Sequence, residues 1–67
     1  MEKQLLSVPA IHCNHCVHTI EMELGELEGV RHVKADAKDK TVAVEYEAPA
    51  TLETITGKLA EINYPVE

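Results

Sequence analysis

Cys13 and Cys16 are the only two cysteines of the chain, and two residues separate them. A Cys-x-x-Cys spacing brings two sulfur atoms together across one tight loop. Thiolates are soft ligands that suit Cu(I), whereas hard cations prefer oxygen. The pair therefore predicts a soft-metal site with Cys13 and Cys16 as its ligands. Such a site is coordinatively unsaturated, so an incoming thiolate can bind the metal before Cys13 or Cys16 leaves it. The ion can then pass between proteins without being released into solution.

The residues after this loop are expected to form a helix that begins at or near Cys16. Four aliphatic residues have the 3, 4, 3 spacing of an amphipathic helix: Val17, Ile20, Leu24 and Leu27. Gly29 is a plausible end of this helix. The free backbone N–H groups and the dipole at a helix start favour thiolate over thiol, which would prepare Cys16 for metal binding.

Two other uses of a Cys-x-x-Cys pair remain open. A structural zinc site needs four ligands, but the chain has no further cysteine, and His32 is its only imidazole far from the loop. A thiol–disulfide enzyme of the thioredoxin type normally has a larger fold than 67 residues allow. Both are less favoured than a metal carrier that is not an enzyme.

Four neighbouring side chains are candidates for a supporting role. His12 and His15 flank Cys13 and can tune the site, and the hydroxyl of Tyr64 can shield a sulfur or donate a hydrogen bond to it. Ile11 is expected to fill the core beneath the loop and fix the geometry of Cys13. The remaining two histidines are expected at the surface: His18 and His32.

The elements that must position this loop follow a recognisable order. We expect a strand at 4–8, a helix from 16 to 27, strands at 30–35 and 41–47, a helix at 52–62 and a last edge strand at 64–66. Thr51 is a suitable N-cap for the second helix. This order predicts an α+β, ferredoxin-like βαββαβ sandwich, with a four-stranded antiparallel sheet and both helices on one face. Residues 1–67 would form a single domain.

Composition and charge limit the function classes. Hydrophobic residues make up 45% of the chain, enough for a core, and the formal net charge of −6 argues against a nucleic-acid partner. No apolar run is long enough to cross a membrane, and the start lacks a signal-peptide core, so a cytoplasmic location is expected. Four glutamates crowd one stretch and could form a docking face for a basic partner: Glu21, Glu23, Glu26 and Glu28.

The cysteine loop and the helix after it resemble the heavy-metal-associated domain family, and the resemblance covers residues 5–66. That family includes small bacterial copper chaperones and domains of metal-transporting P-type ATPases. The segment from Ala10 to Cys16 aligns with the family pattern Gly-Met-x-Cys-x-x-Cys. Tyr64 lies where bacterial members often have tyrosine. The resemblance implies Cu(I) held by two cysteinates and delivery to a P-type ATPase, or to its soluble metal-binding domain, by transient docking.

The loop also departs from the family pattern. Ala10 replaces the usual glycine, and Ile11 replaces the usual methionine. His12 stands where members similar to zinc and cadmium transporter domains have an aspartate that supplies a further ligand. The alternative is therefore a zinc- or cadmium-binding domain of a transporter or regulator with His12 as an added Zn(II) ligand. Two such open sites could also share metal ions in a homodimer.

Overall fold

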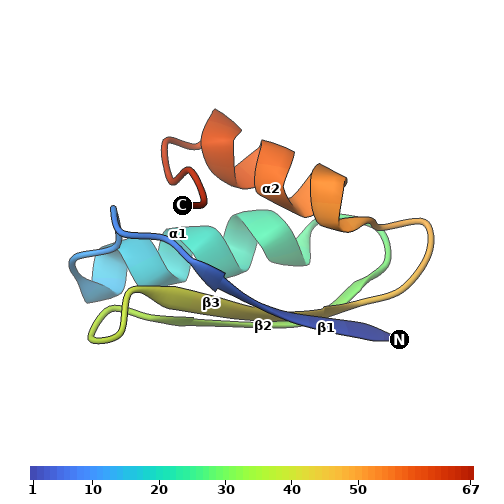
Figure 1. Cartoon of the computed structure of the whole chain (residues 1–67), viewed down its shortest axis with the longest axis horizontal. Helices are drawn as coiled ribbons and strands as arrows, with labels where there is room; N and C mark the ends of the chain where they lie inside the picture. Colours follow the sequence, from blue (N-terminus) through green and yellow to red (C-terminus); the bar gives the residue numbers. More distant parts are fainter.

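A computed structural model describes residues 1–67 and contains five elements. They are strand β1 (Glu2–Ser7), helix α1 (Asn14–Gly25), strands β2 (Val30–Asp36) and β3 (Thr41–Tyr46), and helix α2 (Leu52–Glu61). The expected α+β class, the antiparallel sheet and the two helices on one face are confirmed (Figure 1). No helix is long and apolar enough to cross a membrane.

The sheet has the strand order β1-β3-β2, and both pairs are antiparallel. The side chains of β3 alternate between buried and half-buried, which is the period-two pattern of a sheet covered on one face. The β2–β3 hairpin is closed by Asp36, whose carboxylate accepts hydrogen bonds from the backbone N–H groups of Lys38 and Asp39. Because the Val8 N–H donates to the Lys40 carbonyl, this hairpin lies beside the loop that follows β1.

The core lies between the sheet and the two helices and is almost entirely aliphatic. Its largest fully buried side chains are Ile11, Ile20, Leu24, Ile55, Leu59, Val8, Val42 and Val44. The residues Ile20 and Leu24 of α1, and Ile55 and Leu59 of α2, are the central members of the two helical stripes. The periodicity therefore identified the faces on which both helices pack.

The prediction of a fourth strand at 64–66 is wrong, because the sheet has three strands. The tail after α2 runs back to β1 but forms only one backbone hydrogen bond to it, from the Glu67 N–H to the Ser7 carbonyl, at 2.9 Å. Pro65 has no N–H to donate, so the tail cannot form a regular ladder. Val66 still packs partly buried against the core.

The first helix ends at Gly25, before the expected residue 27. Gly29 therefore does not end the helix, and its role lies in the turn that leads into β2. Gly29 enters β2 with φ +96°, a left-handed conformation that side chains disfavour. A methyl group added there would overlap the Glu47 carbonyl oxygen and lie 2.7 Å from the Ala50 nitrogen. Gly29 is therefore needed for the close contact between this turn and the start of the 47–51 loop.

Two of the four clustered glutamates have partners within the fold. Glu21 accepts a hydrogen bond from the Ala35 N–H of β2 at 3.0 Å, and Glu23 forms a 3.3 Å ion pair with Lys58 of α2. Glu26 and Glu28 follow the end of α1 and are exposed. The face expected to dock a basic partner therefore has only these last two glutamates free, and they lie at the end of α1 remote from the cysteines.

Candidate metal centre

The two cysteines lie where the β1–α1 loop turns into the first helix. Proline and alanine form a tight turn after β1, closed by the hydrogen bond from the Ile11 N–H to the Val8 carbonyl at 3.1 Å. Ile11 is fully buried, as the sequence predicted. Cys13 is the extended N-cap residue of α1, and Cys16 lies in its first turn. The loop is thus attached to the core on one side and to the helix on the other.

The two sulfur atoms face each other at 3.6 Å. Cys13 is half-buried and Cys16 is buried, with 3% of its surface exposed. Both thiols are free. No side chain caps the start of α1, and both cysteines belong to this end of the helix, where the positive end of the dipole lies. This arrangement favours the thiolate form that binds a metal ion.

Tyr64 lies beside Cys16, as the sequence predicted it could. The Asn63 N–H donates to the Ala60 carbonyl and the Tyr64 N–H to the Leu59 carbonyl, while Asn63 has φ 70°. This pattern is a Schellman turn, with asparagine in the left-handed position after the helix. The turn reverses the chain at the end of α2 and brings the Tyr64 ring back to the cysteine loop.

The surroundings of Cys16 lower the pKa of its thiol below the ordinary cysteine value. A hydrogen bond from the Tyr64 hydroxyl and a second from the His12 backbone N–H lower the pKa of Cys16 to about 7, although burial acts in the opposite direction. The same contact raises the pKa of Tyr64, because its hydroxyl proton is held by the sulfur. Near neutral pH, a large fraction of Cys16 is therefore already thiolate.

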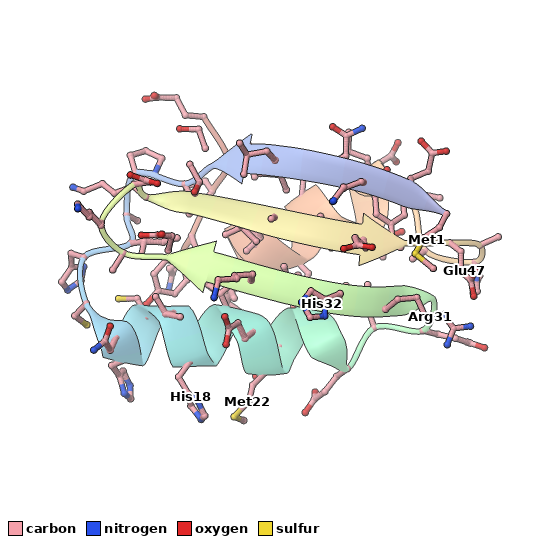
Figure 2. The ribbon with its side chains drawn as sticks, turned by 90° about the horizontal axis from the view of Figure 1, so that it is seen from below. Met1, His18, Met22, Arg31, His32 and Glu47 are labelled. Carbon is pink, nitrogen blue, oxygen red and sulfur yellow. The ribbon has the colours of Figure 1, made fainter.

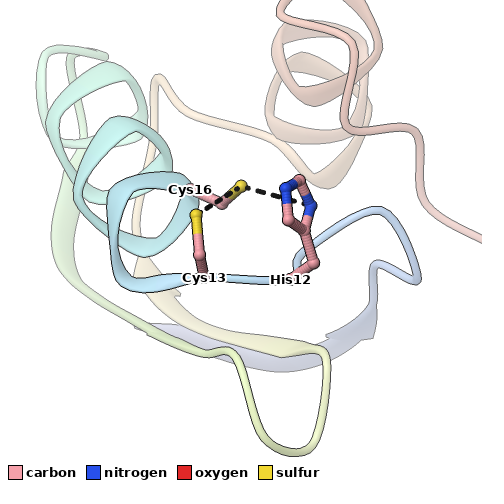
Figure 3. Close-up of side chains that lie close together, drawn as sticks. All are labelled: His12, Cys13 and Cys16. Atoms are coloured by element: carbon pink, nitrogen blue, oxygen red, sulfur yellow. Dashed lines mark hydrogen bonds between the residues drawn. The ribbon is translucent and has the colours of Figure 1, made fainter.

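His12 is the third donor at this site (Figure 3). Its Nδ1 atom lies 3.6 Å from the Cys16 sulfur and 3.0 Å from the Ala10 carbonyl oxygen. One donor atom from each of His12, Cys13 and Cys16 can be chosen so that all three lie within 4.8 Å of one another. Sequence reasoning named His12 but missed the Ala10 carbonyl that holds its ring, because a backbone contact leaves no signal in residue types.

The other histidines lie apart from this group. His15 is exposed on the first turn of α1 and is outside the three-residue cluster. Figure 2 shows His18 projecting from α1 and His32 on the open side of the sheet, and both are exposed. The surface positions expected for His18 and His32 are confirmed.

The donor set matches a soft or borderline metal ion. Two sulfurs and one imidazole nitrogen are the atoms that Cu(I) and Zn(II) prefer, and no carboxylate belongs to the cluster. Cys16 is buried, but Cys13 is half-buried and His12 is exposed, so the site is open to solvent on the side of these two residues. A partner's ligand could therefore approach the ion from that side.

Comparison with known proteins agrees with this geometry. The model of the heavy-metal-associated domain matches residues 5–65 of the chain. The chain belongs to this family. Both cysteines and His12 of this heavy-metal-associated domain lie within the matched region.

Its relatives include proteins of similar length. The COP-associated protein of Helicobacter pylori is 42% identical over 64 residues, which cover 96% of this chain and 97% of that protein. The copper chaperone CopZ of Enterococcus hirae is 36% identical over 66 residues, covering 97% of this chain and 96% of CopZ.

A solved structure connects the same fold with a transporter. The N-terminal domain of a potential copper-translocating P-type ATPase from Bacillus subtilis, in its Cu(I)-loaded state, superposes with a TM-score of 0.89. It is 25% identical, and the match covers 98% of this chain and 84% of that chain. The heavy-metal-associated domain described here is therefore similar both to a copper chaperone and to the N-terminal domain of a potential copper-translocating ATPase.

Proposed function

We propose that the protein is a Cu(I) carrier, not an enzyme, that binds the ion between Cys13 and Cys16. The observation that carries this proposal is the pair of sulfurs 3.6 Å apart at the uncapped start of α1, one of them with a pKa of about 7. Thiolates are soft ligands that suit Cu(I), and a site with only two of them leaves the remaining coordination positions of the ion free. The relative named copper chaperone CopZ and the Cu(I)-loaded ATPase domain support copper as the cargo.

We infer that the carrier hands its ion to a metal-transporting P-type ATPase, or to the soluble metal-binding domain of one, in the cytoplasm. The likeness to the Cu(I)-loaded ATPase domain supports this step, since two similar sites can share an ion through mixed thiolate ligands. The open side of the site allows an incoming thiolate to attach before Cys13 leaves. The same openness would let two copies of the chain share metal ions as a bridged homodimer.

The glutamates expected to dock the partner lie outside the metal site, so docking and metal binding can be tested separately. Glu21 and Glu23 already have intramolecular partners, so their replacement would disturb the fold as well as any docking face. The informative variant is therefore Glu26→Gln with Glu28→Gln, which changes only exposed carboxylates. Weaker binding to the partner domain at low salt, with Cu(I) affinity unchanged, would identify these two residues as part of the docking face.

Zn(II) is the second candidate cargo, and the nearness of His12 to both sulfurs favours it. The two cargoes are separated by titrating the reduced protein with Cu(I) and with Zn(II) in competition with a chromophoric chelator for each ion. We expect the protein to retain Cu(I) far better than Zn(II), and Cys16→Ser to lose Cu(I) to the chelator. Retention of Cu(I) by Cys16→Ser, or a preference for Zn(II), would contradict the copper-carrier proposal.

A further inference from the structure

Two side chains that can bind a soft metal ion lie about one turn apart on the outward face of α1. His18 and Met22 are four residues apart, and residues at this spacing share one face of a helix, with about 5–6 Å between their Cβ atoms. Both are exposed, and 51% of the Met22 surface is accessible. The buried residues of α1 are Cys16, Ile20 and Leu24. The pair therefore lies on a different face of the helix from the thiol of Cys16.

The Met22 side chain extends toward His18. In an α-helix the Cα–Cβ bonds tilt toward the N-terminus, so a long side chain covers the turn before it. Figure 2 shows the thioether of Met22 and the imidazole of His18 projecting in the same direction from α1, away from β2. Zinc enzymes with a His-Glu-x-x-His helix hold one ion with two side chains at this spacing. One ion can therefore contact both donors without any change in the backbone.

Neither donor is used by another group of the fold. Of the four imidazole rings, only that of His12 forms a hydrogen bond, and no ion pair includes a histidine. Met22 is not one of the side chains that pack on the hydrophobic core. The two carboxylates next to Met22 in the sequence are engaged elsewhere, Glu21 by a hydrogen bond from β2 and Glu23 by an ion pair to α2. The sulfur and the ring are thus free to bind a ligand.

We propose that His18 and Met22 form a second site for a soft monovalent ion, Cu(I), separate from the two cysteines. Thioether sulfur and imidazole nitrogen are ligands that suit copper, whereas a hard cation prefers oxygen. Both donors are neutral, while the two thiolates bring negative charge to the ion, so the cysteine site fills first. The pair would allow the chain to hold a second ion once Cys13 and Cys16 are loaded.

A single exposed methionine is ordinary on a protein surface, so the test has to show that the two donors act together. Met22→Leu nearly conserves the volume and the apolar character of the side chain but removes its sulfur. His18→Ala removes the imidazole. His32→Ala is the matched control, because it removes an exposed imidazole on the open side of the sheet. Met1 is the internal control for methionine, since it is also exposed.

The experiment is an anaerobic titration of the reduced protein with Cu(I), followed by NMR of 13C-methyl-labelled methionine and 15N-labelled histidine. We expect the first equivalent to leave the Met22 methyl resonance in place, and the second to shift it together with the His18 ring resonances. Met22→Leu should abolish the His18 shift, His18→Ala should abolish the Met22 shift, and His32→Ala should match the wild type. An unshifted Met22, an equal shift of Met1, or a His18 shift that persists in Met22→Leu would overturn the proposal.

The double variant Cys13→Ser with Cys16→Ser keeps this site separate from the proposed function. Because it has no thiolate, the first equivalent of Cu(I) should already shift Met22 and His18. If these two residues shift at the first equivalent in the wild type as well, the cysteines do not hold the first ion and the proposed function is wrong. If the wild type holds the first ion at its cysteines and neither residue shifts at the second equivalent, only the second site is wrong.

Discussion

The two helices of this protein start in opposite ways, although they present similar apolar stripes to the core. Thr51 caps α2: its hydroxyl oxygen accepts from the Thr54 N–H at 3.1 Å, and Glu53 places a negative charge in the first turn. At the start of α1 the N-cap residue is Cys13, no side chain caps the free N–H groups, and the first turn has no acidic residue.

The difference shows that the start of α1 lacks the stabilising cap of α2 at the place where the two metal-binding cysteines lie. A Ser, Thr or Asp at an N-cap normally satisfies a free N–H, and an acidic first turn interacts well with the dipole. At Cys13 a carboxylate nearby would repel a thiolate, and an oxygen cap would replace a metal ligand. The start of α1 thus keeps its positive end for the two sulfurs, while the start of α2 uses the usual stabilising residues.

Cys13→Ser tests this comparison with the largest expected effect. Serine supplies the missing cap oxygen, so the metal-free protein should become more stable by about 1 kcal/mol. The same change removes one of two thiolates, so Cu(I) should pass to a chelator that the wild type withstands. Urea unfolding of the metal-free protein and a Cu(I) competition assay measure the two effects. A loss of stability would contradict the view that α1 lacks a cap.

Tyr64→Phe tests whether the ring brought back by α2 prepares the sulfur at the start of α1. Without the hydroxyl, the pKa of Cys16 should rise from about 7 toward the ordinary cysteine value of about 8.5. NMR of 13C-labelled cysteine gives this pKa directly. An unchanged value would show that Tyr64 only fills space.

The lowered pKa of Cys16 also predicts a pH-dependent stability. A thiol with a depressed folded-state pKa contributes stability that is present above the unfolded-state pKa and is lost as pH falls through about 7. The urea midpoint of the metal-free wild type should therefore rise between pH 7 and pH 9 by more than the midpoint of Tyr64→Phe does. Parallel pH profiles for the two proteins would contradict this linkage.

Thr51→Ala should have the smallest effect and only a structural one. Loss of the cap should lower the free energy of unfolding by about 1 kcal/mol. Thr51→Ser is the control, since it keeps the cap oxygen. Both variants should bind Cu(I) like the wild type, because Thr51 begins α2 at the end opposite to Asn63 and Tyr64. A changed Cu(I) affinity would mean that the two helix starts are not independent.

Much of this architecture could be predicted from residue spacing. The stripes that include Ile20 and Ile55 identified both helices, and the alternation in β3 identified a half-buried strand. The fourth strand was predicted wrongly because an apolar tail such as that at Val66 can pack on the core without forming a ladder, and Pro65 interrupts the pairing.

The pair of cysteines and its neighbours were also visible in the sequence, but their contacts were not. Tyr64 reaches Cys16 only because a Schellman turn at Asn63 reverses the chain, and this turn depends on backbone hydrogen bonds. Likewise, the carboxylate of Glu21 satisfies an N–H of β2, although its sequence context suggested a solvated docking face. Residue types identify which groups are able to react, whereas backbone geometry decides which groups meet.

The central claim is that two thiolates of this chain hold Cu(I). Copper K-edge X-ray absorption of the reduced protein loaded with one equivalent of Cu(I) tests it most directly, because it identifies and counts the atoms bonded to the metal. We predict a first shell made of the sulfurs of Cys13 and Cys16, which Cys13→Ser and Cys16→Ser each alter. A first shell of nitrogen and oxygen, or a sulfur shell that both variants leave unchanged, would contradict the account.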